Sequence, residues 1–198
     1  MTDPRLVRQL WRGRTNVDAL TIACIEHAEA IAGHKFVVTQ GSYQSGAGDR
    51  NSAGTHNLGG VVDLRWCGHG SCIRALRLAG MAAWHRTPAQ GPWPDHIHAV
   101  VVDHPRLAAS AQAQVTAYRN GRNGLANNGP DDGPRLEPTP TPTFPWPPNT
   151  SDYLRPDLNE AMAAVKRVEG KVQRRPRMRY WAKRARQAIR KMRQINRG

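Results

Sequence analysis

Two stretches of the sequence carry side chains that commonly bind divalent metal ions. In residues 52–65, SAGTHNLGGVVDLR, His56 and Asp63 stand seven residues apart. Asp63 lies in VVDL, which has the apolar character of a short buried strand. Because a carboxylate among apolar side chains is costly unless something pairs it, this position favours a bound cation.

The second stretch, residues 92–102, reads PWPDHIHAVVV and offers Asp95, His96 and His98 before a strand-like run. On a strand, side chains two residues apart share a face, so both imidazoles are expected on the same side. Two imidazoles and one carboxylate around an open fourth position form the ligand set of a catalytic zinc ion. The two stretches together therefore predict a zinc site.

These motifs resemble those of the LAS-type zinc peptidases, which include D-Ala-D-Ala carboxypeptidases and dipeptidases and phage L-alanyl-D-glutamate endopeptidases. SAGTHNLGGVVD resembles the family's S-x-x-H-x-x-x-G-x-x-D segment, shifted by one residue before the histidine. Asp95 and His98 match its D-x-x-H segment. The resemblance covers about residues 15–125 and implies an α+β fold, a small antiparallel sheet with packed helices as in the LAS and hedgehog proteins.

The resemblance also implies a role for each residue of the two motifs. It assigns His56, Asp63 and His98 as the zinc ligands and Asp95 as the general base of peptide hydrolysis. His96 then lies near the metal and is expected to hydrogen-bond the developing oxyanion. On an ideal strand Asp95 and His98 would point to opposite faces, so the base role requires Asp95 to lie in the loop before the strand.

Substrate binding is expected from the segment that precedes the first motif. Many relatives have a Tyr-Arg pair there, whose arginine binds a substrate carboxylate, but here Gln44 follows Tyr43. The expected substrate-binding residues are Gln40, Tyr43, Gln44 and Arg50, of which Gln40 or Arg50 is expected to take the place of that arginine. The Gly/Ser-rich residues 44–55 are interpreted as a loop on the substrate side.

Hydrophobic periodicity predicts the elements that position these residues. Helix 17–32 is expected to end at Gly33, and Ser71 is the expected N-cap of a second helix. The predicted helices are 17–32, 71–86 and 106–119, and the predicted strands are 35–43, 61–64 and 97–102.

Three cysteines are too few for a disulfide scaffold. Cys67, His69 and Cys72 lie close together in CGHGSC, and a second metal site there would lack a fourth ligand. A disulfide between Cys67 and Cys72 is an alternative in an oxidising compartment. The favoured interpretation is a loop with free thiols.

Charge and composition divide the chain into three segments. A zinc peptidase domain is predicted at 1–119, a Gly/Pro/Thr-rich linker at 120–150 and a basic α-helical tail at 151–198. The tail contains 15 Lys or Arg and 4 Asp or Glu, which gives +11 of the formal net charge of +14. It is expected to bind a polyanion, which would be teichoic acid, an anionic membrane surface or nucleic acid, or to contact other virion proteins.

The resemblance implies a zinc-dependent peptidase that cleaves the stem peptides of bacterial peptidoglycan, as a phage endolysin or a virion-associated lysin. The alternatives are a non-enzymatic virion or tail protein that retains a LAS-type fold, and a nucleic-acid-binding protein that acts through its basic tail. No apolar run reaches the roughly 20 residues of a transmembrane helix, and the first residues lack a signal-peptide core. The expected location is therefore the host cytoplasm followed by the cell wall, or the virion.

Overall fold

The computed structural model describes residues 3–12, 15–44, 53–145 and 187. The chain forms two compact units, Met1–Pro148 and Asn149–Gly198. The site lies in the first unit. The predicted basic tail at 151–198 lies outside the described residues, apart from Gln187.

The centre of the first unit is a four-stranded antiparallel sheet with the order β3-β4-β6-β5. Its strands are β3 (Val38–Gln40), β4 (Val61–Arg65), β5 (Met81–Arg86) and β6 (His96–Val101). The two central strands, β4 and β6, bring together the two motifs predicted to bind metal. A second sheet pairs β1 (Arg8–Trp11) with β2 (Thr15–Asp18).

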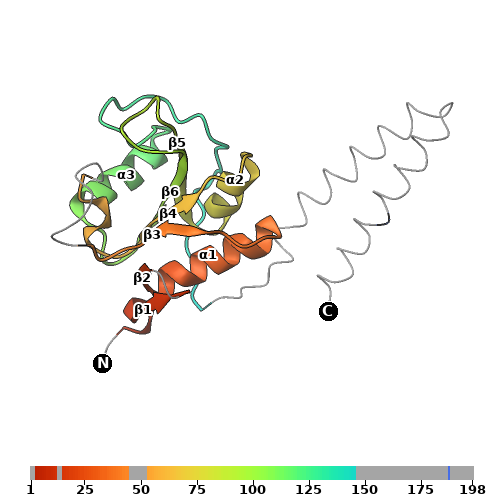
Figure 1. Cartoon of the computed structure of the whole chain (residues 1–198), viewed down its shortest axis with the longest axis vertical. Helices are drawn as coiled ribbons and strands as arrows, with labels where there is room; N and C mark the ends of the chain where they lie inside the picture. Colours follow the sequence, from red (N-terminus) through yellow and green to blue (C-terminus); the bar gives the residue numbers. More distant parts are fainter. Residues whose placement is uncertain (1–2, 13–14, 45–52, 146–186, 188–198) are drawn as a thin grey trace. The chain divides into compact units, whose positions relative to one another are not determined.

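Helices cover both faces of the four-stranded sheet, as Figure 1 shows. α1 (Ala19–Ala32) and α2 (Ser71–Leu78) pack on one face, and α3 (Ala109–Arg119) packs on the other. Short 3-10 turns occur at Pro4–Leu6 and at Thr55–Asn57. This arrangement confirms the predicted α+β class with a small antiparallel sheet.

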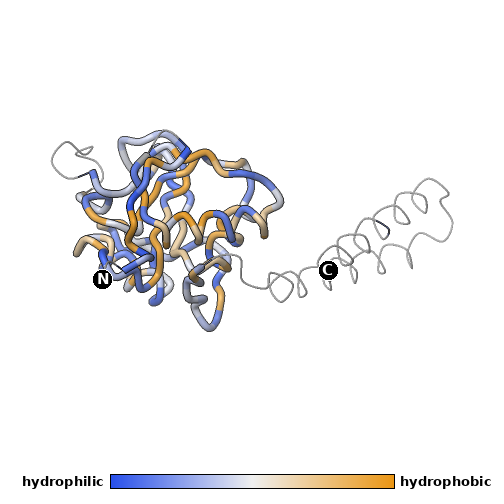
Figure 2. Tube along the Cα trace, turned by 90° about the horizontal axis from the view of Figure 1, so that it is seen from below, coloured by the Kyte–Doolittle hydropathy of each residue, from blue (hydrophilic) through white to orange (hydrophobic). Residues whose placement is uncertain are grey.

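Strand alternation creates two hydrophobic cores, one on each face. Toward α1 and α2 the sheet buries Leu64 and Ile97, and toward α3 it buries Val61, Trp84 and Val100. Figure 2 shows the hydrophobic stretches of the trace concentrated in the strands and helices that form these cores. The predicted metal ligands Asp63 and His98 lie on the α3 face, because the register pairs Asp63 with His98 and His98 with Trp84.

The predicted helix 71–86 is wrong in its second half. α2 ends at Leu78, Gly80 adopts a positive φ of 86°, and the chain returns as strand β5. A Cβ on Gly80 would come within 2.4 Å of the Pro142 backbone, so this turn needs a glycine. MAAW has good helix formers, but pairing with β6 overrides that local preference and puts Ala83 and Trp84 in different cores.

Other boundaries differ by a few residues. The first helix begins at Ala19, where Asp18 accepts a hydrogen bond from the Thr21 backbone N–H, and it ends at Gly33 as predicted. The N-cap of α2 is Gly70 rather than Ser71. Only the middle of the predicted strand 35–43 pairs as β3, the strand predicted at 97–102 is β6, and α3 begins three residues later than predicted.

The described part of the predicted linker packs on the domain. The Arg77 guanidinium donates hydrogen bonds to the Pro134 carbonyl and to the Asp131 carboxylate, and the Trp84 indole donates to the Arg122 carbonyl. Phe144 packs against the core under α1 and α2. The compact unit therefore continues past residue 119, because this segment supplies two acceptors of the buried Arg77 in addition to the Ala83 carbonyl.

Within the part of the chain that the structure describes, none of the helices combines the length and the apolar composition that a membrane crossing requires.

Candidate metal centre

Three elements bring His56, Asp63 and His98 to one point on the α3 face of the sheet. Asp63 lies at the middle of β4, and His98 is its register partner on β6. His56 belongs to the 3-10 turn that precedes β4. One ligand atom from each of the three residues lies within 4.8 Å of the others, and all three side chains are largely buried.

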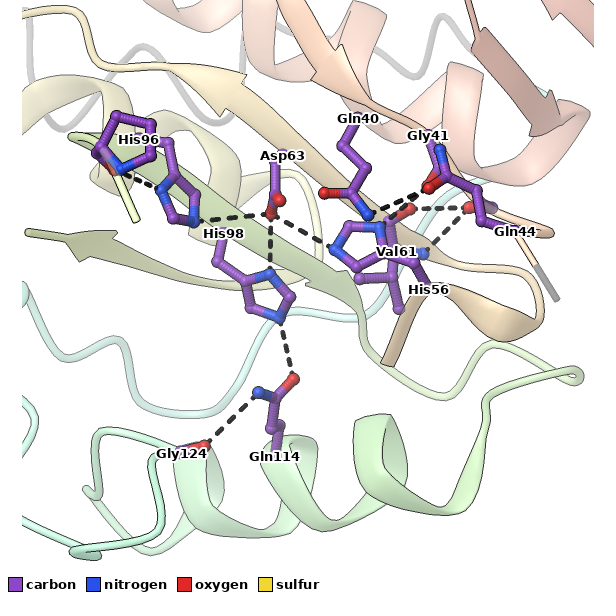
Figure 3. Close-up of polar contacts among 12 residues, drawn as sticks. Gln40, Gly41, Gln44, His56, Val61, Asp63, His96, His98, Gln114 and Gly124 are labelled. Atoms are coloured by element: carbon purple, nitrogen blue, oxygen red, sulfur yellow. Dashed lines mark hydrogen bonds and ion pairs between the residues drawn. The ribbon is translucent and has the colours of Figure 1, made fainter. Parts of the chain in front are cut away.

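Three imidazoles converge on a single carboxylate oxygen, as Figure 3 shows. The Oδ1 atom of Asp63 lies 2.8 Å from His98 Nδ1, 3.4 Å from His56 Nε2 and 3.8 Å from His96 Nε2. His96 joins the group because it shares the strand face of His98, as predicted.

The ring nitrogens of His56 and His96 that face away from Asp63 indicate which tautomer each ring adopts. His56 Nδ1 lies 2.8 Å from the Gly41 carbonyl oxygen, and His96 Nδ1 lies 2.8 Å from the Pro94 carbonyl oxygen. A carbonyl only accepts hydrogen bonds, so each Nδ1 carries the proton. In a neutral ring the Nε2 lone pair then points toward Asp63.

The His98 ring is also fixed by a hydrogen bond on its outer side, but here Nε2 is the outer nitrogen and Nδ1 faces Asp63. Its Nε2 lies 2.9 Å from Gln114 Oε1, and the Gln114 amide nitrogen donates to the Gly124 carbonyl at 3.4 Å. That second contact orients the amide, so His98 Nε2 donates and Nδ1 is left with its lone pair toward Asp63. Neutral imidazoles thus direct lone pairs at an anionic oxygen, an arrangement that a bound cation would stabilise.

Electrostatics keep the Asp63 carboxylate charged. Burial alone would raise the pKa of Asp63, but His56 and His98, when protonated on the side that faces Asp63, donate hydrogen bonds to its carboxylate and hold that pKa well below its usual value. Burial lowers the pKa of His98, although Asp63 opposes the shift. A charged carboxylate beside neutral imidazoles is the protonation state that binds metal.

The residues present fit a divalent metal ion. Nitrogen and carboxylate oxygen are the ligands that zinc accepts at about 2.0–2.2 Å, which separates neighbouring ligand atoms by about 3.4 Å in a tetrahedron. The separation of 3.4 Å between Asp63 Oδ1 and His56 Nε2 agrees with that value, whereas the 2.8 Å between Asp63 Oδ1 and His98 Nδ1 is a hydrogen-bond distance that would lengthen around an ion. Outer hydrogen bonds from ligating histidines to carbonyl oxygens are typical of metal sites, because they fix the ring and its tautomer.

The candidate metal ligands line a cavity of about 290 Å³. Side chains from the sheet, the turn before β4 and the segment after α3 form its walls. Beyond the three candidate ligands, the lining comprises Gln40, Ala53, Thr55, Arg86, Trp93, His96, Gln114, Gly124, Leu125 and Ala126.

Arg86 is a functional candidate that the sequence interpretation missed. Its side chain lines the cavity, its exposed fraction is 3%, and among the described residues neither Nη1 nor Nη2 has a hydrogen-bond partner. Burial lowers the pKa of Arg86 to about 10, although Asp63 opposes the shift, so the guanidinium stays charged at neutral pH. Arg86 is the register partner of His96, so a prediction of residues 81–86 as a strand could have placed it beside the candidate ligands. Hydrophobic periodicity predicts a helix over 71–86 instead, and Arg86 was therefore missed.

Asp95, the predicted general base, lies apart from the three candidate ligands. Its carboxylate accepts from His85 Nε2 at 3.0 Å, and 55% of the side chain is exposed. His85 stacks on Trp66, and its register partner is Ile97, which belongs to the core on the opposite face. Asp95 is also absent from the described lining of the cavity.

The four predicted substrate-binding residues have different positions. Gln40 lines the cavity, and its amide nitrogen donates to Gln44 Oε1 at 3.0 Å. Tyr43 donates its hydroxyl to Asp18 Oδ2 instead, and the Arg8 guanidinium lies over its ring. Arg50 lies outside the described residues.

A scan of protein-family models, a search of curated proteins and a search of solved structures each return no significant match to this chain.

Proposed function

We propose that the protein is a zinc-dependent peptidase that cleaves the stem peptides of bacterial peptidoglycan. The observation that carries the proposal is the set of three imidazoles whose outer nitrogens are fixed as donors while their inner nitrogens face Asp63 Oδ1. His56, Asp63 and His98 would hold the zinc, and the cavity beside them would receive the peptide. The zinc supplies a Lewis acid for the peptide carbonyl and makes water at the site more acidic.

His96 is placed to move the proton in this reaction. Because its Nδ1–H is donated to the Pro94 carbonyl, its Nε2 lone pair is free to accept a proton from the attacking water. The resulting imidazolium then donates to the oxyanion or to the leaving amine. In this proposal His96 takes the base role that the resemblance assigns to Asp95, whose carboxylate contacts His85.

We infer that Arg86 would favour a peptide substrate with a free carboxylate. Stem peptides carry free carboxylates, and a guanidinium whose Nη atoms have no hydrogen-bond partner among the described residues would bind a carboxylate through two parallel hydrogen bonds. Burying the Arg86 charge costs free energy, and an ion pair with the substrate carboxylate would offset part of that cost. This arginine comes from β5, whereas the arginine of the family's Tyr-Arg pair precedes the first motif.

The basic tail would carry the enzyme to a polyanionic surface. We propose wall teichoic acid or an anionic membrane as its partner, with release through a membrane lesion or delivery in a virion. Support comes from the charge of +11 in residues 151–198.

The proposal is tested by incubating the full-length, zinc-loaded protein with purified peptidoglycan and analysing the released fragments by mass spectrometry. We expect new peptide termini that identify one cleaved bond, together with their loss in His56→Ala, which should also lack zinc at this centre. As a matched control, His85→Ala alters an imidazole on the other face and should keep both metal and cleavage. Intact peptidoglycan with a fully loaded enzyme would exclude the peptidase.

A further inference from the structure

A second cluster of metal-binding atoms lies on the other side of the sheet from the candidate metal centre. Cys67, His69 and Cys72 come from the loop before α2 and its first turn, and each offers one ligand atom within 4.8 Å of the others. Cys72 belongs to the core that faces α1 and α2, whereas the metal centre lies on the α3 face. The cluster therefore has a role separate from the catalytic site.

The fold brings a fourth possible ligand, His34, to the cluster from outside the CGHGSC segment. His34 follows α1, 38 residues before Cys72, and its Nε2 lies 3.6 Å from Cys72 Sγ. His69 Nδ1 lies 3.8 Å from Cys72 Sγ and 4.0 Å from Cys67 Sγ. The ring centroids of His34 and His69 are 6.1 Å apart, and the two rings are nearly perpendicular.

These separations agree with a tetrahedral zinc site. Zinc–sulfur bonds of about 2.3 Å and zinc–nitrogen bonds of about 2.0–2.1 Å place sulfur and nitrogen about 3.6 Å apart. Two cysteines separated by four residues also match the spacing of structural zinc sites.

His34 is oriented as a ligand. Its Nδ1–H donates a hydrogen bond to the Ala32 carbonyl oxygen at 3.3 Å, so the Nε2 lone pair is directed at the Cys72 sulfur.

We propose that Cys67, His69, Cys72 and His34 form a structural zinc site in the reduced protein. The structure shows a disulfide between Cys67 and Cys72, so the favoured prediction of free thiols is wrong and the oxidised alternative is present. A thiol or phosphine reductant gives two electrons to the disulfide, and with two protons the sulfurs become two thiols. Zinc then binds both sulfurs as thiolates and releases two protons to solvent.

The disulfide form and the zinc-bound form would connect different parts of the domain. The disulfide closes only the loop that contains Cys67 and Cys72. Zinc would also bind His34 and so join that loop to the C-terminal end of α1. The reduced, metal-bound state would therefore stabilise the contact between α1 and the segment that leads into α2.

The experiment uses cobalt(II) on the full-length protein, because thiolate–cobalt coordination produces a near-ultraviolet charge-transfer band. The candidate centre at Asp63 contains no sulfur, so its occupancy does not affect this band. We expect the band in phosphine-reduced protein, its persistence in reduced His56→Ala, and its absence after oxidation. Elemental analysis should show one zinc fewer per chain in the oxidised protein.

Two variants assign the ligands. Cys67→Ser should lose the band, and His34→Gln should weaken binding at least tenfold. Cys24→Ala is the matched control, since Cys24 is a buried free thiol in α1 and should leave the band intact. If reduced wild-type protein shows no charge-transfer band at saturating cobalt, or if Cys67→Ser retains it, the cluster is only a disulfide site.

Discussion

Arg86 illustrates how one buried side chain narrows the choice of substrate. Its guanidinium is nearly inaccessible to solvent and, among the described residues, has no hydrogen-bond acceptor at Nη1 or Nη2. Arg86 lines the same cavity as Asp63, so its positive charge lies close to a ligand that enters the site. A cation in that environment is stabilised by an anionic group of the substrate.

We predict that Arg86→Gln raises KM for stem peptides and lowers kcat/KM about 10- to 100-fold, with zinc content unchanged. A hydrogen bond to a charged group contributes about 1.5–3 kcal/mol, which is the basis of this range. Steady-state kinetics on a defined peptide and elemental analysis check it. Arg119→Gln is the control, because Arg119 pairs with Asp103 on the surface. Unchanged KM in Arg86→Gln would contradict carboxylate recognition by this residue.

The identity of the general base is a second question at the residue scale. His96→Gln should keep zinc but lose about 10²–10⁴-fold in kcat, the usual contribution of general acid–base catalysis. Asp95→Asn should stay near wild type, because its carboxylate contacts His85 at a largely exposed position. If Asp95→Asn loses activity and His96→Gln keeps it, Asp95 is the general base, and its carboxylate must break the contact with His85 during catalysis.

At the scale of elements, two glycines allow the turn before β4 to approach α1 and the segment after β6. A Cβ on Gly59 would lie 2.5 Å from His104 and from the Tyr43 hydroxyl, and 2.8 Å from Asp18 Oδ2. Tyr43 thus has a structural contact, because its hydroxyl and the N-cap of α1 meet at this glycine. The neighbouring Gly60 has a φ of 80°, which favours glycine.

We predict that Gly59→Ala destabilises the domain by about 1–3 kcal/mol, the usual cost of adding a methyl group to a packed site. The midpoint of chemical unfolding, followed by circular dichroism, measures this change. Gly70→Ala is the matched control, since a Cβ there meets nothing within 4 Å and Gly70 has a φ of −69°. Equal midpoints for the two variants would mean that the packing around Gly59 relaxes freely.

At the scale of the whole molecule, catalysis and targeting are expected to separate along the chain. The described contacts show that the domain extends through at least residue 144, because Phe144 packs against its core and Arg77 depends on Asp131 and Pro134. The charge is concentrated beyond that point, in residues 151–198.

We predict that a chain ending at Thr150 folds, binds zinc and cuts short soluble stem peptides at the rate of the full-length protein. On whole cell walls it should act more weakly, and the advantage of the full chain should shrink as salt rises, because exposed charges are screened within about 8 Å at 0.15 M. Turbidity clearing at several salt concentrations measures both effects. A chain ending at Arg119 is the contrast and should unfold more readily, since it lacks two of the acceptors of Arg77. Equal clearing of walls by the Thr150-ending and full-length chains at low salt would argue against targeting by the tail.

The sequence alone predicted the candidate metal ligands, the α+β class and the first helix with its glycine end. Those features follow from local pattern: a carboxylate in an apolar run, histidines two residues apart, and helical periodicity before Gly33. Local pattern could not predict the strand at residues 81–86, because these residues favour a helix by themselves. They form a strand only because they pair with β6. The positions of Arg86 in the cavity, Asp95 against His85, and His34 beside Cys72 depend on contacts between segments distant in sequence. Only the tertiary structure decides such contacts, since burial and hydrogen-bond partners are properties of the packed chain rather than of any local window.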